Sequence, residues 1–154
     1  MKRQQFGSTQ SGFTLVELVV VIVILGILAA TALPRFINLT NDARIASING
    51  IAGGLRSAVG VVQARHFASG GTASTVNMVD GTSVAVAAAT GIPTGALLGI
   101  GNAMTGLTLA EGVTSDYATA TAVTFRLSSF ATSATCQISY NGTTGLVTVT
   151  TTGC

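Results

Sequence analysis

The sequence predicts an α+β protein in which a long N-terminal helix, with a hydrophobic half and an amphipathic half, packs on a small antiparallel β-sheet. Residues 13–68 carry apolar patterns of helical type, and residues 69–154 are rich in β-branched residues, alanine and turn glycines. Only 8% of the 154 residues are charged, and the formal net charge is +2. So few charges would not keep a free monomer soluble, which favours a location in a membrane or in a polymer.

The N-terminus combines a polar stretch with an apolar run. Residues 1–12, MKRQQFGSTQSG, are basic and carry no acid, and the run from Phe13 to Leu33 contains a single charge, Glu17. As a helix this run is about 31 Å long, enough to cross a bilayer core of about 30 Å. The basic residues before it put the N-terminus in the cytoplasm. A removable secretory signal would have a shorter apolar region, so a membrane anchor is favoured over it.

Glu17 has a purely local explanation. Thr14-x-x-Glu17 fits a capping box, in which the glutamate satisfies a free backbone N–H at the helix start. The helix dipole also favours a carboxylate there. A glutamine could cap equally well without bringing charge into hydrocarbon, so the capping role leaves the cost of the charge unexplained.

An amphipathic helix is predicted after the apolar run. Apolar residues recur at alternating spacings of three and four and form one stripe, made of Ile45, Ile48, Ala52, Leu55, Val59 and Val62. The pattern ends at ASGG, residues 68–71, where paired glycines break it. Pro34 lacks an N–H and crowds the carbonyl four residues earlier, and Gly26 loosens the same segment. A kink or local melting is therefore expected between Gly26 and Pro34.

The C-terminal part reads as strands and turns. Asp80-Gly81 lies between two apolar-rich runs and predicts a hairpin. Residues 91–106 are rich in glycine and predict a loop without regular structure. Three antiparallel strands are predicted at the end of the chain, at 122–127, 135–140 and 146–151.

Cys136 and Cys154 are the only two cysteines. In an exported domain the simplest expectation is one disulfide between them, which would close a loop of about 19 residues and stabilise the fold by roughly 3 kcal/mol. The alternative is two free structural thiols, which would suit a cytosolic protein.

The sequence contains few residues that could form a catalytic or metal-binding site. His66, the only histidine, is expected to be a solvated or packed residue at the end of the helix. Asp80, Glu111 and Asp116 are spaced too widely for a recognisable metal loop. The sequence also lacks the clustered basic residues of a nucleic-acid interface. We therefore expect no catalytic residue, cofactor, metal or nucleic acid.

The stretch GFTLVELVVVIVILGILAATALPRF resembles the class III signal of type IV pilins, in which a basic leader ends in Gly, Phe follows, and Glu stands four residues later inside an apolar helix. The continuation PRFINLTNDARIASINGIAGGLRSA further resembles the pilin of the mannose-sensitive haemagglutinin pilus, in the type IVa group. The C-terminal cysteine pair also fits the disulfide-bounded region of type IV pilins. A twelve-residue leader is longer than most in the type IVa group.

The resemblance implies how the chain is processed. A prepilin peptidase would cut between Gly12 and Phe13 and methylate the new amine of Phe13. The chain would comprise a leader (1–12), a transmembrane and filament-core helix (13–34), an amphipathic continuation (35–68) and a β-rich region with a disulfide loop (69–154). The segment from Gly26 to Pro34 matches the part that loses helical order on assembly.

The function implied is that of a structural subunit of a type IV pilus, used for adhesion and for retraction-driven movement. Its partners would be further copies of itself, the prepilin peptidase and the pilus assembly machinery, with residence in the inner membrane before assembly and on the cell surface afterwards. Glu17 would pair with the amine of Phe13, in its own or a neighbouring copy, because a buried charge requires a partner. The alternatives are a pseudopilin of a type II secretion system and a signal-anchored protein that never polymerises.

Overall fold

The computed structural model describes residues 12–119, 121–130 and 132–154, with residues 33–38 described by their backbone alone. The predicted leader, 1–12, lies outside the described residues except for Gly12. The chain divides into two units, Met1–Thr40 and Asn41–Cys154. Helix α1 (Leu15–Ala68) contributes residues to both. Its observed start at Leu15 falls two residues after the predicted one.

In the second unit, α1 supplies the apolar stripe that its sequence predicts. Five of the six stripe residues are buried and the sixth, Ile45, packs against them; the buried five are Ile48, Ala52, Leu55, Val59 and Val62. The helix ends at Ala68, where Gly70 and Gly71 adopt positive φ values of 109° and 70°. The Gly71 amide donates to the carbonyl of His66 at 3.0 Å, which satisfies a carbonyl that the helix leaves free. The predicted end of the helix is confirmed.

The Asp80-Gly81 hairpin is confirmed. Strands β1 (Thr75–Asn77) and β2 (Ser83–Ala85) pair antiparallel, with Val76 opposite Val84. Gly81 has φ 85°, a conformation that glycine adopts without strain. The two valines are buried in a small core that includes Val62 of α1, so the hairpin is attached to the helix.

Residues 91–106 contain more regular structure than their glycine content predicts. A five-residue π-helix, η1 (Leu97–Gly101), lies within them. Its Gly99 lies against the backbone of Thr94 so closely that a Cβ would overlap it. A short 3-10 helix, η2 (Leu109–Glu111), follows. The expectation of a wholly irregular loop was wrong, because glycine here permits a tight turn of helix against neighbouring backbone.

A four-stranded antiparallel sheet completes the second unit. Its strands lie in the order β3-β4-β5-β6 and are β3 (Val113–Thr119), β4 (Ala122–Leu127), β5 (Gln137–Tyr140) and β6 (Val147–Thr150), with the 3-10 helix η3 (Ser128–Phe130) after β4. The three predicted strands are present, with β5 and β6 slightly shorter than expected. Strand β3 was not predicted.

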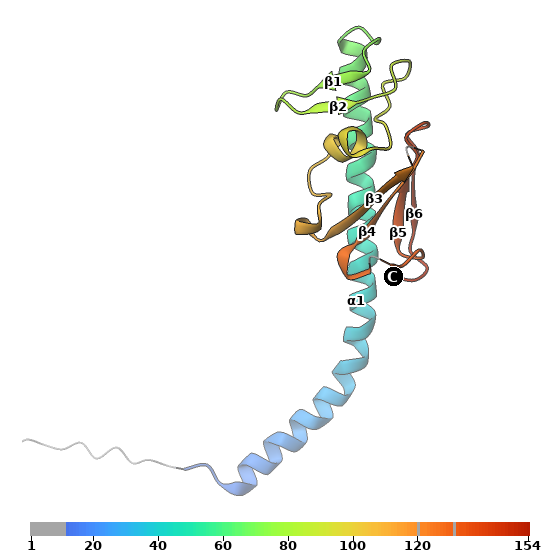
Figure 1. The fold of residues 1–154 in the computed structure, drawn as a ribbon. Coiled ribbons are helices and arrows are strands. Elements are labelled where there is room, and N and C mark those ends of the chain that lie inside the picture. Colours follow the sequence, from blue (N-terminus) through green and yellow to red (C-terminus); the bar gives the residue numbers. More distant parts are fainter. Residues whose placement is uncertain (1–11, 120, 131) are drawn as a thin grey trace, which may run out of the picture. The chain divides into compact units, whose positions relative to one another are not determined.

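The core lies between the stripe of α1 and one face of this sheet. Leu55 of α1, Phe125 of β4 and Tyr140 of β5 are all fully buried in the same apolar cluster. Figure 1 shows the tip of the β1–β2 hairpin projecting on one side of α1 and strands β5 and β6 on the other. The α+β class is confirmed, with the helix and the antiparallel sheet sharing one core.

Candidate functional site

The start of α1 shows how Glu17 is held. The side-chain oxygen of Thr14 accepts a hydrogen bond from the Glu17 amide at 3.2 Å, and the Thr14 carbonyl accepts from the Leu18 amide. Thr14 therefore acts as an N-cap, and Glu17 lies in the first turn, where the helix dipole favours a negative charge. The structure thus supports the threonine half of the predicted capping box.

The apolar segment at the start of α1 is exposed within its own unit, as far as the described residues show. Residues Leu15–Ala32 are long and apolar enough to span a membrane, and none of this stretch is buried within the unit. Phe13 is 88% exposed and Leu15 77% exposed. Such an apolar surface requires lipid or other protein chains around it.

The predicted kink falls partly within the described residues. Gly26 is helical, and a Cβ placed there would meet no atom within 4 Å. Position 34 lies within the bounds of α1, while the side chain of Pro34 is outside the described residues.

Cys136 and Cys154 are joined by a disulfide across a sequence separation of 18. Both residues are buried. The Arg44 guanidinium donates to the carbonyl of Cys154 at 3.1 Å and to the side chain of Asn41 at 3.1 Å. Cys154 is therefore held both to Cys136, directly before β5, and to α1.

His66 is a packed core residue, one of the two alternatives that its position in the sequence allows. It is fully buried, and its Nε2 lies 3.0 Å from the carbonyl oxygen of Ala88. Among the described residues, no three His, Cys, Asp or Glu side chains form a group that could hold a metal. His66 therefore stabilises the end of α1 against the loop that follows β2.

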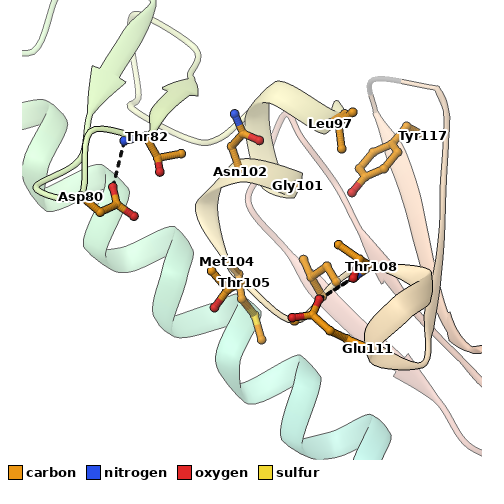
Figure 2. Close-up of a pocket in the computed structure, with 12 residues that line it drawn as sticks. Asp80, Thr82, Leu97, Gly101, Asn102, Met104, Thr105, Thr108, Glu111 and Tyr117 are labelled. Carbon is orange, nitrogen blue, oxygen red and sulfur yellow. Dashed lines mark hydrogen bonds between the residues drawn. The ribbon is translucent and has the colours of Figure 1, made fainter.

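The second unit also carries a surface groove. It consists of two adjoining cavities of about 280 Å³ and 380 Å³, which share Asp80, Asn102, Met104 and Thr105 among their lining residues. The first cavity extends to Tyr117 and the second to α1. Figure 2 shows Asp80 and Glu111 toward opposite ends of the first cavity, with Asn102, Met104 and Thr105 between them.

The groove is anionic. Among the described residues, Asp80 and Glu111 are the two charged side chains that line it, and no Lys, Arg or His lines either cavity. The Thr82 amide donates to the Asp80 carboxylate at 2.9 Å, and the bonds from Thr82 lower the pKa of Asp80. Glu111 accepts from the amide and hydroxyl of Thr108 at 3.3 and 2.6 Å, which completes a capping box at η2. Both carboxylates are therefore fixed in place by local hydrogen bonds.

The grouping of these acids was missed from sequence. The spacing of Asp80, Glu111 and Asp116 in the sequence predicts no common site, whereas the structure places Asp80 and Glu111 on one groove and leaves Asp116 outside it. The sequence does contain the local signals, a turn at Asp80-Gly81 and a Thr108-x-x-Glu111 capping pattern. It does not contain the packing of the hairpin against η1 that brings them together.

Comparison with known proteins addresses both parts of the chain. Residues 7–33 match the family described as the prokaryotic N-terminal methylation motif. The type IV narrow pilus major component PilA5 of Thermus thermophilus is 52% identical over 56 residues, which is 35% of this chain and 48% of that protein. The type II secretion system core protein G of Pseudomonas aeruginosa is 38% identical over 68 residues, 44% of this chain and 45% of that protein. These alignments each cover about half of the relative's length.

A longer relationship comes from the fimbrial protein EcpC of Eikenella corrodens, which is 37% identical over 119 residues, 70% of this chain and 77% of that protein. No solved structure gives a significant match. Since this similarity covers most of both chains, and the methylation motif covers the start of the apolar helix, the chain belongs to the type IV pilin family.

Proposed function

We propose that this chain is the structural subunit of a type IV pilus and polymerises through its N-terminal helix into a surface filament. The observation that carries the proposal is the apolar segment Leu15–Ala32, none of which is buried among the described residues of its own unit. The segment contains one carboxylate, Glu17, four residues after Phe13. A membrane would cover it before assembly, and copies of the same segment would cover it in the filament core.

Processing at Gly12 and Phe13 is part of the proposal. A prepilin peptidase cleaves between these residues, removes the leader 1–12 and methylates the Phe13 amine; the match of residues 7–33 to the methylation motif supports this. The N-terminus faces the cytoplasm in the inner membrane before assembly, because the basic residues lie before the apolar run. The assembly machinery then transfers the subunit into the filament.

Glu17 gives the assembly its register. The new amine of Phe13 lies at the start of the same helix, and it pairs with Glu17 of its own or a neighbouring copy. The bond from the Glu17 amide to Thr14 uses only the backbone of Glu17, and among the described residues no hydrogen bond engages its carboxylate, which can therefore take part in this pairing. A copy docked out of step would leave charge unpaired in an apolar environment, at a cost of several kcal/mol.

The segment from Gly26 to Pro34 unwinds on assembly. Gly26 weakens the helix at a position with no neighbouring side chain, and a proline at position 34 cannot supply a backbone donor. The filament serves attachment to surfaces and retraction-driven movement. The resemblance of residues 34–58 to the pilin of the mannose-sensitive haemagglutinin pilus supports a place in the type IVa group.

A type II secretion pseudopilin is the second candidate, supported by the similarity to the Pseudomonas core protein G. The disulfide that fixes the C-terminus favours the pilin. Imaging separates the two: long extracellular filaments containing this chain support a pilus, and confinement to the periplasm supports a pseudopilin.

The proposal is tested on cells that express the full chain, by mass spectrometry of the subunit's N-terminus and electron microscopy of sheared filaments. We expect filaments whose subunits begin at a methylated Phe13. Glu17→Val is expected to leave cleavage and membrane insertion intact and to abolish or strongly reduce filaments. Glu17→Gln is the matched control, because it keeps a capping side chain and removes the charge. Normal filament yield from Glu17→Gln would reduce Glu17 to a local cap, and normal yield from both variants would leave Glu17 without a role in assembly.

A further inference from the structure

The groove and the opposite face of the second unit are complementary in charge and apolar character. We infer that the groove is the docking site for the Arg56–Leu146 surface of a second copy of this chain; the inference rests on the proposed polymer and identifies one of its contacts. The Arg56–Leu146 surface is defined by these two residues. Arg56 is hydrogen-bonded to the carbonyl of Val147, the residue that follows Leu146.

The groove offers negative charge beside apolar side chains. Asp80 and Glu111 supply the charge. Their hydrogen bonds with Thr82 and Thr108 engage Oδ1 of Asp80 and Oε2 of Glu111. Leu97 and Val61, which line the two cavities, are 59% and 53% exposed. An apolar cleft with fixed carboxylates suits a cationic side chain that also has an apolar neighbour.

The opposite face offers that combination. Arg56 is exposed, and one nitrogen of its guanidinium donates to the carbonyl of Val147 at 3.1 Å. This bond fixes the group beside Leu146, which is 60% exposed. A guanidinium has five donors, so it can bind a carboxylate while it keeps the bond to Val147.

The two surfaces lie on different sides of α1. Gly54, Ser57, Ala58 and Val61 line the groove, and at about 100° per residue Arg56 lies roughly 150° around the helix from their mean direction. Figure 1 agrees with this division, because the tip of the hairpin and β6 project on opposite sides of α1.

Two unlike surfaces on opposite sides produce a particular kind of contact. A surface that pairs with itself closes a dimer, whereas unlike surfaces on opposite sides leave each new copy with one of each still free. Such a contact gives a closed ring or an open helical filament, depending on the rotation between copies, and the filament is the form that fits the proposed polymer. The positions of the groove and of Arg56 therefore favour a second copy over an unrelated basic ligand.

The chain offers variants that remove charge and keep the local structure. Asp80→Asn keeps a side chain that can accept from Thr82, and Glu111→Gln keeps a capping-box side chain. In the full chain expressed in cells, the Asp80→Asn/Glu111→Gln variant and Arg56→Gln are each expected to lower the yield of sheared filaments about fivefold or more. Arg65→Gln, which removes an exposed charge outside this contact, is the matched control and is expected to keep the yield.

Combining the groove changes with Arg56→Gln tests whether they affect filament yield through the same contact. Combining all three changes is expected to lower the yield no further than either variant alone, because both remove the same contact. Additive losses, or full yield from Arg56→Gln, would overturn the inference. Subunit amount and N-terminal cleavage are measured in every strain, so that poor folding is recognised.

A photo-crosslinking residue in place of Leu146 gives the direct readout in filaments. It is expected to join to the groove, at residues 78–82 or 97–111 of another copy. A cross-link elsewhere on the chain, or to a different protein, would overturn the docking site while leaving the pilus intact. If the unaltered chain forms no filaments, the proposed function fails and this inference fails with it.

Discussion

The guanidinium carbon of Arg44 lies 4.2 Å from the centre of the Phe130 ring. The same guanidinium donates to the carbonyl of Cys154, so one side chain on α1 contacts both η3 and the end of the chain. Charged hydrogen bonds to backbone and a cation over an aromatic face are each favourable when partly shielded from water, as Arg44 is.

Arg44→Ala should lower the free energy of unfolding of the full chain in detergent by about 2 kcal/mol, because both contacts are lost. Arg44→Lys should lower the free energy of unfolding by less, since lysine keeps the positive charge although it lacks the planar guanidinium. Chemical denaturation followed by circular dichroism measures both. Arg65→Ala, at an exposed site with a single bond to Asn77, is the control and should change the value by less than about 0.5 kcal/mol.

Tyr140 should make the fold sensitive to alkali. Its hydroxyl donates to the carbonyl of Pro93 at 2.6 Å, and burial raises the pKa of the phenol above its usual value near 10. The folded state therefore binds this proton more tightly than the unfolded state does. The contribution of Tyr140 to the free energy of unfolding is therefore constant below about pH 10 and then falls by about 1.4 kcal/mol per pH unit.

Tyr140→Phe should remove most of this alkaline decline and lower stability at neutral pH, because the Pro93 carbonyl loses its donor. Unfolding measured between pH 8 and pH 11 gives both effects. Tyr117→Phe is the comparison, and it should retain the decline that Tyr140 causes. An unchanged slope in Tyr140→Phe would assign the decline to another group.

Gly91 combines two constraints. Its φ is 67°, and a Cβ there would lie 2.7 Å from the Cδ2 atom of the His66 ring. Gly91→Ala should therefore destabilise the second unit by about 2–4 kcal/mol through backbone strain and overpacking. Gly106→Ala is a matched control: its φ is 91°, but a Cβ would meet no atom within 4 Å, so only the strain of about 1 kcal/mol is expected. Equal losses from the two variants would mean that the contact with His66 costs nothing.

Removing the disulfide by Cys136→Ala together with Cys154→Ala should cost roughly 3 kcal/mol in the chain-entropy description. Thermal unfolding with and without reductant measures it, and the double variant should not respond to the reductant. A thiol assay of the unreduced protein should detect no free cysteine, and two titrated thiols would contradict the pairing.

Sequence predicted those features that depend on contacts close along the chain. The stripe from Ile45 to Val62 repeats with the period of its own helix, and the Asp80-Gly81 turn joins strands that are neighbours in sequence. Strand β3 was missed because its alternation is weak and contains Asp116, a residue that strands disfavour. Its identity as a strand depends largely on the pairing with β4.

The groove could not be predicted for a related reason. Asp80 and Glu111 are thirty-one positions apart in the sequence. They lie on elements whose relative position depends on how residues 91–106 fold. That segment includes a π-helix in close contact with Thr94, an arrangement that has no sequence pattern of its own.

The disulfide also decides how the second unit would respond to mechanical load. A force applied between α1 and Cys154 would pass from Cys136 through the sulfur atoms, and the residues between the two cysteines would lie outside its path. Strands β5 and β6 both fall in that sheltered segment. In a pulling experiment the oxidised chain would therefore extend about 60 Å less on unfolding than the reduced one, and its last two strands would carry no tension.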